Sequence, residues 1–204
     1  MEYEIVDRVL VLKGSFEALS TGVDGGRRAT KNILNIQVPH DFSHDDPKSY
    51  VEGVAASVKL DGGYVALLTA VEMKNVQILN DACVTVFITA GLTNPSSFGT
   101  INIIVISSAT LSEGAIAGTI ITATEAKTHA LLDKGLRFTG TTSDAIVVAY
   151  EKSRDGEPIL YSGPATAFGG RVAKLVRIGV KDALKAHYGS DDVEKAISDQ
   201  AVID

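Results

Sequence analysis

The sequence predicts an α/β fold, with a mixed, largely antiparallel sheet covered by helices in a single domain spanning residues 1–204. Its 204 residues, 45% of them hydrophobic, suit one fairly large domain with a substantial core. Strand and helix patterns alternate in places, and several strand patterns also follow one another without a helix between them. Because antiparallel strands need only short turns whereas parallel strands need long crossovers, this order favours a mixed sheet.

Short runs rich in Val, Ile, Leu and Ala indicate the strands, because such residues pack well on a pleated surface. The run at 100–107 is the strongest of them. With 6% aromatic residues and no Trp, the core is expected to consist mainly of aliphatic side chains. The predicted strands cover residues 9–12, 33–38, 64–69, 75–78, 83–90, 100–107 and 145–150.

Three stretches carry apolar residues at helical spacing. Asp46 and Pro47 are typical of an N-cap and a first helical residue. Ser112 can cap a long helix that Gly135 stops. A further short helix is expected in the tail, residues 190–204. The three main helices are predicted at about 47–61, 112–134 and 165–188.

Turn-forming residues mark the loops between these elements. A glycine-rich loop is expected at 21–28, and the turn-rich segment 91–99 is expected at the surface. The loop at 139–144 leads into the last strand, and residues 154–156 resemble a hairpin turn.

Composition and charge argue against several classes of function. The formal charge is −6, from 19 basic and 25 acidic residues without a Lys/Arg block, so no nucleic-acid partner is expected. The single cysteine, Cys83, excludes an internal disulfide and a cysteine-based zinc site. No glycine-rich phosphate-binding motif is present. The acidic N-terminus differs from a signal peptide and the apolar runs are short, so a cytoplasmic protein without membrane partners is expected.

The first candidate for chemistry is the segment 98–102, in which Gly99 precedes Thr100 at the start of the strongest strand. A rigid strand can hold a nucleophilic hydroxyl, and a glycine beside it lets a substrate approach the backbone. The plain alternative is a loop-to-strand junction in which Thr follows its ordinary β preference.

The second candidate is the loop 140–144. Thr142 and Ser143 can bind polar groups of a substrate, and Asp144 can orient a donor or act as a base. Loops at strand ends commonly host functional sites. The alternative is an Asx or Ser/Thr turn that only leads the chain into the next strand.

The third candidate is the polar segment 40–46, which contains His40, His44, Asp45 and Asp46. These side chains could act as acid and base or bind a metal ion. The alternative is a solvated loop that ends in a helix cap. Because α/β domains place ligands at strand ends, this segment is expected to share a cleft with the other two candidates.

Two other histidines are expected to lie at the surface. Glu125 and His129 are four residues apart on the second helix and can form a pair there. His187 is expected at the exposed end of the last helix, where a cationic ring would complement the helix dipole.

Longer strings resemble adenosylcobinamide amidohydrolases, in order, from about residue 20 to residue 185. The segment 35–42, Asn-Ile-Gln-Val-Pro-His-Asp-Phe, with Asp45-Asp46-Pro47 after it, looks like the N-terminal signature of that family. The resemblance implies an enzyme that hydrolyses the amide joining aminopropanol to the corrinoid side arm of adenosylcobinamide, giving adenosylcobyric acid. The other matching segments are 68–71, 89–95, 99–105, 124–127, 140–146 and 161–164.

On this resemblance the corrinoid is a small-molecule substrate, and no metal or other cofactor is assigned. A homo-oligomer is compatible with the sequence. Thr100, His40 and Asp144 are the expected catalytic residues. The residues expected to bind substrate are Asn35, Asp45, Asp46, Thr93, Asn94, Glu125, Thr142 and Ser143.

The segment 99–109 also resembles the nucleophile strand of ornithine acetyltransferases and β-aminopeptidases, in which a small residue precedes a Thr or Ser that opens a hydrophobic strand. A long helix and a Ser-Asp motif follow in that pattern, much like 142–146 here, although Ser107-Ser108 stands where the pattern has Thr-Asp. This resemblance implies that Thr100 is the nucleophile. Cleavage of the chain before Thr100 would make its own α-amine the base.

Two other functions stay open on the sequence. One is a Thr-nucleophile hydrolase or acyltransferase acting on a small amino-acid amide, and the other is a non-catalytic corrinoid-binding module. A shift of visible absorbance on mixing with cobinamide would favour either corrinoid function over the first alternative. Release of aminopropanol would separate an enzyme from a binding module.

Overall fold

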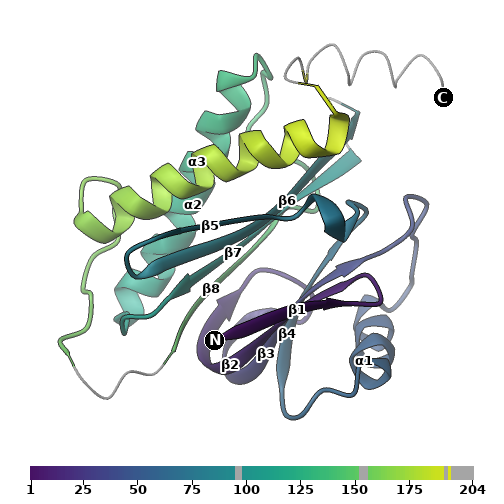
Figure 1. The fold of residues 1–204 in the computed structure, drawn as a ribbon, viewed down its shortest axis with the longest axis horizontal. Coiled ribbons are helices and arrows are strands. Elements are labelled where there is room, and N and C mark those ends of the chain that lie inside the picture. The colour runs from purple at the N-terminus through teal and green to yellow at the C-terminus, as the bar shows by residue number, and fades with distance from the viewer. Residues whose placement is uncertain (95–97, 152–155, 191–192, 194–204) are drawn as a thin grey trace.

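The computed structural model describes residues 1–94, 98–151, 156–190 and 193. Within these residues the chain forms an eight-stranded sheet and three α-helices (Figure 1). The helices are α1 (Pro47–Ser57), α2 (Glu113–Asp133) and α3 (Ala167–Tyr188), with a short 3-10 helix, η1 (Met73–Asn75). The strands are β1 (Glu2–Val6), β2 (Val9–Ser20), β3 (Gly26–Gln37), β4 (Tyr64–Thr69), β5 (Gln77–Asp81), β6 (Val84–Asn94), β7 (Phe98–Ser107) and β8 (Ala145–Glu151).

The strands are ordered β4-β3-β2-β8-β7-β6-β5, and β1 pairs with β2 beside this path. The pairs β3–β4 and β7–β8 are parallel. The other pairs in the described part of the chain are antiparallel. The predicted α/β fold with a mixed, largely antiparallel sheet is therefore confirmed.

The sheet folds over on itself at β2. The register between β2 and β3 shifts between Lys13 and Phe16, and such a bulge bends and twists a strand. Before the bulge β2 pairs with β1, and after it β2 pairs with β8. The half formed by β1–β4 consequently lies against the half formed by β5–β8, with α1 outside the first half and α2 and α3 outside the second (Figure 1).

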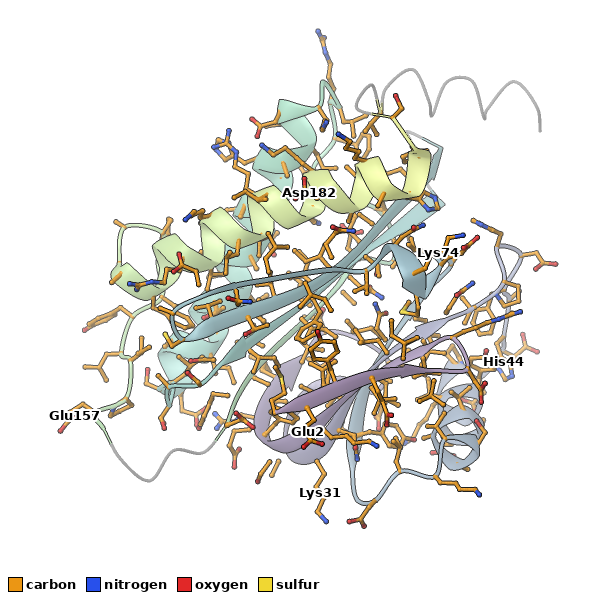
Figure 2. The ribbon with its side chains drawn as sticks, viewed as in Figure 1. Glu2, Lys31, His44, Lys74, Glu157 and Asp182 are labelled. Atoms are coloured by element: carbon orange, nitrogen blue, oxygen red, sulfur yellow. The ribbon has the colours of Figure 1, made fainter. Side chains whose placement is uncertain are left out.

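Side chains alternate between the two faces of each half, as the period of a strand requires. On β7, Ile101, Ile103 and Val105 pack against α2 and α3, whereas Ile104 and Ile106 point toward the other half of the sheet. Aliphatic side chains and a few aromatic rings fill the space between the halves (Figure 2). They include Leu10, Leu12, Phe16, Ile33, Val65, Leu67, Phe87 and Val147.

A buried polar layer interrupts this apolar space between the halves. The Asn35 amide on β3 donates to Thr89 Oγ1 on β6 at 3.0 Å and accepts from Asn102 Nδ2 on β7 at 2.8 Å. Asn102 Nδ2 also donates to the Leu68 carbonyl on β4 at 2.9 Å. Within the described residues, Asn102 Oδ1 is buried without a hydrogen-bond partner. Because buried amides need partners, this layer fixes how the two halves are aligned.

The helix boundaries follow the local capping signals. Asp46 caps α1, since its carboxylate accepts hydrogen bonds from the backbone N–H groups of Lys48 and Ser49. Ser112 caps α2, as predicted, and α3 ends at Tyr188, also as predicted. α1 ends at residue 57, four residues before the predicted end at about 61.

Other predicted boundaries need correction. The segment 91–99 was expected to be a surface turn, but Gly91 and Leu92 belong to β6 and are buried. The reason is that β6 and β7 continue their antiparallel pairing to the pair Leu92–Gly99. The strand expected at 75–78 is displaced to 77–81 by η1, and β1 was not predicted. Residues 95–97, most of the 154–156 turn and most of the 190–204 tail lie outside the described residues.

No helix in the described ranges combines the length and the apolar character that crossing a membrane requires.

Leu67 allows a test of the packing between the two halves. Its side chain is fully buried in the cluster that joins them. We expect Leu67→Ala to lower the free energy of unfolding in urea by ~2–5 kcal/mol, because it leaves a cavity. Leu132→Ala on α2, where the side chain is 54% exposed, should change it by less than ~0.5 kcal/mol. Equal losses in the two variants would contradict the burial described here.

Candidate functional site

A cavity of about 330 Å³ opens at one end of the space between the two halves of the sheet. Its walls come from the chain after β3, the chain after β4, the start of β7, the loop before β8 and the end of α3. It brings together His40, Thr100 and Ser143, one from each candidate segment. The cleft predicted for His40, Thr100 and Asp144 thus contains the first two, whereas Asp144 is not among the residues that line it.

The alternation along β7 directs Thr100 into this cavity. Ile101 and Ile103 face the helices, so Thr100 and Asn102 face the inner side of the folded sheet. Asn102 lies in the buried polar layer, and Thr100, two residues nearer the end of the strand, lines the cavity. Directly opposite Thr100 on β6 is Gly91, which carries no side chain that could fill the space.

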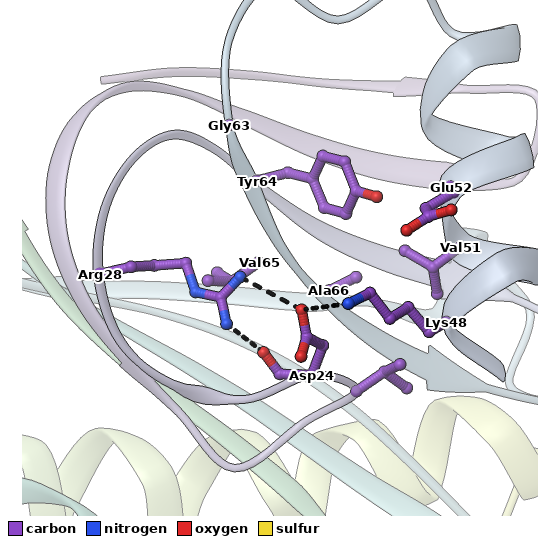
Figure 3. A pocket seen from close by; sticks show the side chains of 10 residues that line it. Asp24, Arg28, Lys48, Val51, Glu52, Gly63, Tyr64, Val65 and Ala66 are labelled. Atoms are coloured by element: carbon purple, nitrogen blue, oxygen red, sulfur yellow. Dashed lines mark hydrogen bonds and ion pairs between the residues drawn. The ribbon is translucent and has the colours of Figure 1, made fainter.

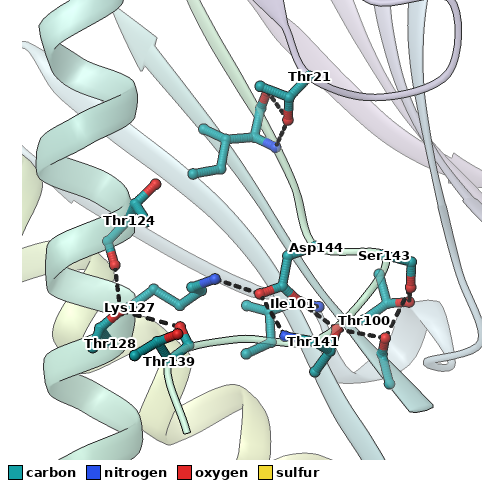
Figure 4. Close-up of polar contacts among 12 residues, drawn as sticks. Thr21, Thr100, Ile101, Thr124, Lys127, Thr128, Thr139, Thr141, Ser143 and Asp144 are labelled. Atoms are coloured by element: carbon teal, nitrogen blue, oxygen red, sulfur yellow. Dashed lines mark hydrogen bonds and ion pairs between the residues drawn. The ribbon is translucent and has the colours of Figure 1, made fainter. Parts of the chain in front are cut away.

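Hydroxyl groups surround the peptide bond before Thr100 (Figure 4). The Thr100 and Ser143 hydroxyl oxygens lie 2.6 Å apart, and the Ser143 hydroxyl reaches the Gly99 carbonyl at 2.8 Å. The Thr141 hydroxyl reaches the same carbonyl at 2.6 Å. Because a hydroxyl has one proton, Ser143 can donate to Gly99 only while Thr100 donates to Ser143. Either hydroxyl can donate in the contact between them, so the Thr100 proton can also point away from Ser143.

Gly99 has a conformation and surroundings that require glycine. Its φ is +151°, which L side chains rarely adopt. A Cβ at this position would lie 2.6 Å from the Gly91 carbonyl oxygen and 2.9 Å from the Leu92 Cα. The close approach of β6 and β7 at the mouth of the cavity depends on this residue.

Asp144 lies behind the cavity and acts as a junction between three segments (Figure 4). Its carboxylate accepts from the Ile101 N–H at 2.9 Å, from the Thr141 N–H at 3.1 Å and from the Thr141 hydroxyl at 2.6 Å. It also forms an ion pair with Lys127 of α2, whose residue is only 6% exposed. These contacts occupy the carboxylate, which was expected to be catalytic, and hold the loop 139–144 against β7.

Lys127 was missed by the sequence reasoning, which singled out Glu125 and His129 on the same helix. A signal was present, because Lys127 is four residues after Ala123 and three before Ala130, both on the buried face of α2. A charged residue at helical spacing within an apolar face indicates a buried partner.

His187 was expected at an exposed helix end, and that expectation is wrong. Its ring is half-buried and lines the cavity with His40 and Thr100. Burial, and secondarily the nearby His40, lower the pKa of His187 below its usual 6.5, while Glu72 opposes the shift. The cavity therefore contains an imidazole that is neutral at pH 7.

Phe42 adds an aromatic surface to the cavity wall. Its ring lies 4.8 Å from the Tyr50 ring of α1 and stacks at 6.0 Å on His44, measured between ring centroids. His44 is not among the residues that line the cavity. Its Nδ1 accepts a hydrogen bond from the Asp46 N–H.

The other predicted substrate-binding residues whose side chains the structure describes lie away from the cavity wall. Asn35 is buried in the polar layer behind it, and Asp46 caps α1. Asp45 and Thr142 are exposed. Glu125 is exposed on the outer side of α2 and lines a separate depression between α2 and α3. Thr93 and Asn94 are the last residues of β6, and their side chains lie outside the described part of the structure.

A second cavity, of about 220 Å³, lies between α1, β4 and the turn before β3 (Figure 3). Three of its charged groups are paired, since Asp24 lies 3.6 Å from Arg28 and 3.5 Å from Lys48. Tyr64 also lines it, and burial raises the pKa of this phenol. None of the expected catalytic residues lies there, so we place the candidate site in the first cavity.

Among the described residues, no group of three or more His, Cys, Asp and Glu side chains is arranged to hold a metal ion. The metal-binding alternative for residues 40–46 therefore has no such set of ligands in this part of the chain. The groups that the cavity does offer are hydroxyls and imidazoles, which are the groups of nucleophilic and acid–base catalysis.

A helix-covered mixed sheet that presents a strand hydroxyl and two imidazoles in one cavity has the side-chain groups that a hydrolytic enzyme uses. Comparison with known proteins agrees with this class. The family model described as adenosylcobinamide amidohydrolase matches residues 8–192. The chain belongs to the adenosylcobinamide amidohydrolase family.

Two curated relatives carry the name adenosylcobinamide amidohydrolase. The protein from Methanosarcina mazei is 45% identical over 196 residues, covering 91% of this chain and 98% of the relative. The protein from Halobacterium salinarum is 33% identical over 199 residues, covering 87% of this chain and 85% of the relative. No solved structure matches this chain.

The buried ion pair behind the cavity can be tested through stability. We expect Lys127→Met to lower the free energy of unfolding by ~3–5 kcal/mol, because it leaves the Asp144 carboxylate without a counter-ion. The double variant Lys127→Met/Asp144→Asn should recover part of that loss. Lys31→Met removes an exposed pair with Asp61 and should cost at most ~1 kcal/mol. Urea titrations measure all three, and an equal cost for Lys127→Met and Lys31→Met would refute the buried pair.

Proposed function

We propose that this chain hydrolyses the amide bond between aminopropanol and the corrinoid side arm of adenosylcobinamide, releasing adenosylcobyric acid. The observation that carries this proposal is the relative of that name, which is 45% identical and covers 91% of the chain. The cavity with Thr100 supplies groups suited to amide hydrolysis. We further propose that residues 1–204 act as one domain, since the family match extends across nearly all of the folded core.

The size of the cavity suggests how such a substrate binds. At about 330 Å³, it is at the lower end of ligand pockets, which span roughly 300–1,000 Å³. The side arm and its amide fit this space, and the flat macrocycle stays at the mouth. Phe42, supported by Tyr50, presents an aromatic surface there. We assign this surface to contact with the corrinoid ring.

The proposed chemistry begins at Thr100. Its hydroxyl oxygen attacks the amide carbonyl, the carbon–nitrogen bond breaks, and aminopropanol leaves with a proton on its nitrogen. Water then hydrolyses the resulting ester and restores the hydroxyl. Ser143 holds the Thr100 hydroxyl at 2.6 Å, and Asp144 positions the loop that carries Ser143. The rival mechanism is direct attack by water with His40 as the base.

The base for Thr100 has two sources. One is an imidazole of the cavity. The other is the α-amine of Thr100 itself, which becomes free if the peptide bond after Gly99 is cleaved. The Ser143 hydroxyl, which reaches the Gly99 carbonyl, would stabilise the oxyanion of such a self-cleavage. The intact mass of the active protein distinguishes these sources, because cleavage yields two chains, 1–99 and 100–204.

The proposed activity has a direct test. Purified protein incubated with adenosylcobinamide should release aminopropanol and adenosylcobyric acid without added nucleotide, because the sequence has no phosphate-cradling glycine motif. Chromatography coupled to mass spectrometry detects both products. Substrate that stays intact across a range of pH and divalent metals would contradict the proposed hydrolase activity. Binding of cobinamide without hydrolysis would favour a corrinoid-binding module.

Substitution of Thr100 tests the nucleophile. We expect Thr100→Ala to lower turnover at least ~10³-fold, on the scale seen when the nucleophile of other hydrolases is removed. Thr100→Ser keeps a hydroxyl and should retain measurable activity. Thr124→Ala, on the exposed side of α2, is the matched control and should leave turnover unchanged. A folded Thr100→Ala protein with a near-normal rate would contradict the nucleophilic role of Thr100 and favour direct attack by water.

A further inference from the structure

His187 lies beside Thr100 although the two residues are far apart in the sequence. Its Nε2 atom is 3.1 Å from the position that a Cβ on Gly91 would occupy. Gly91 is the register partner of Thr100 on the neighbouring antiparallel strand. Directly opposed side chains point to the same face with Cβ atoms about 4.5–5.5 Å apart. The His187 ring and Val71, whose Cγ2 is 2.7 Å from the same position, therefore fill the space that the glycine leaves next to the Thr100 side chain, and all three side chains line the cavity.

The fold holds this ring in place. β5 begins at Gln77 opposite Ile88, so β6 has no partner strand on that side at Gly91, and the end of α3 reaches the cavity there. The next residue, Tyr188, accepts a hydrogen bond from the Leu92 N–H at 2.7 Å and donates one to the Leu92 carbonyl. The Tyr188 ring packs edge-on against His187, with centroids 4.8 Å apart. A side chain fixed by a helix and an anchored neighbour is preorganised for chemistry.

We propose that His187 is the proton-transfer residue of the amide hydrolysis. Its imidazole accepts the proton of the attacking Thr100 hydroxyl and returns it to the nitrogen of the departing aminopropanol. In the second step it accepts a proton from water, which attacks the ester, and gives that proton back to the Thr100 oxygen. This role rests on the proposed function and consumes only the substrate and water.

His187 suits this role better than the other groups of the cavity. His40 and His187 are the titratable side chains among its described lining residues, and His40 is on an exposed loop. The Asp144 carboxylate is occupied by Lys127 and by backbone N–H groups. The Ser143 hydroxyl donates to the Gly99 carbonyl, and a carbonyl oxygen is not protonated at neutral pH, so this contact provides no base.

The surroundings keep the His187 imidazole able to accept a proton. Burial lowers its pKa, and the nearby His40 lowers it further. Glu72 acts in the opposite direction, and its own carboxylate is paired with Lys74, which projects from η1 (Figure 2). Since the folded-state pKa lies below 6.5, the ring is neutral at pH 7 and becomes protonated only at more acidic pH.

The test is the pH dependence of kcat/KM in the wild-type protein, His187→Gln and His40→Gln. A base must be neutral to act, so wild-type activity should fall on the acid side with an apparent pKa below 6.5. His187→Gln should lose at least ~10²-fold in kcat and no longer show this acid limb. His40→Gln changes the other titratable side chain of the cavity, so it should keep the acid limb and retain a larger fraction of the wild-type kcat.

Several results would overturn this role. One is a folded His187→Gln protein with a near-normal rate and an unmoved acid limb. Another is an acid limb that disappears in His40→Gln, because the limb would then belong to His40; this result does not depend on how His187→Gln folds. A third is an active protein whose mass shows cleavage before Thr100, because the freed α-amine would then be the base. A wild-type protein without any hydrolysis would contradict the proposed function itself.

Discussion

The geometry of the candidate site depends on the buried ion pair between Lys127 and Asp144. Lys127 comes from a helix on the outer face of the sheet, yet its partner holds the loop that reaches the inner face. Through the Ile101 N–H, Asp144 also fixes the start of β7. The Thr141 hydroxyl then links the carboxylate to the Gly99 carbonyl. A charge buried in this position is costly unless it is fully partnered, so these contacts form or fail together.

The cavity exists because the sheet folds over at the bulge in β2. A flat sheet would have exposed Thr100 on an open face, whereas the folded one places it at the end of an enclosed space. The two halves bring the chain after β3 and β4 over the start of β7. Residues from distant parts of the sequence thereby converge on one amide-sized volume, which suits an enzyme of the adenosylcobinamide amidohydrolase family.

Local chemistry in the sequence was sufficient for part of this structure. The cap at Asp46 and the strand opened by Thr100 follow from residues within a few positions of each other. The meeting of His40 with Thr100 followed from the rule that strand ends host ligands. The position of His187 could not be predicted, because it depends on where β5 begins relative to β6. The role of Asp144 likewise depends on Lys127, a partner 17 residues away on another element.

The polar layer of Asn35, Thr89 and Asn102 lies behind the cavity. A lone amide in an apolar interface lowers stability but selects one alignment, because any other alignment leaves it unsatisfied. By this reasoning, sliding β3 along β6 and β7 would strand these amides among aliphatic side chains. An all-aliphatic layer would bind the two halves of the sheet more tightly, but it would allow several alignments of one half relative to the other. The layer therefore fixes the offset between the two halves and, with it, the shape of the cavity that they enclose.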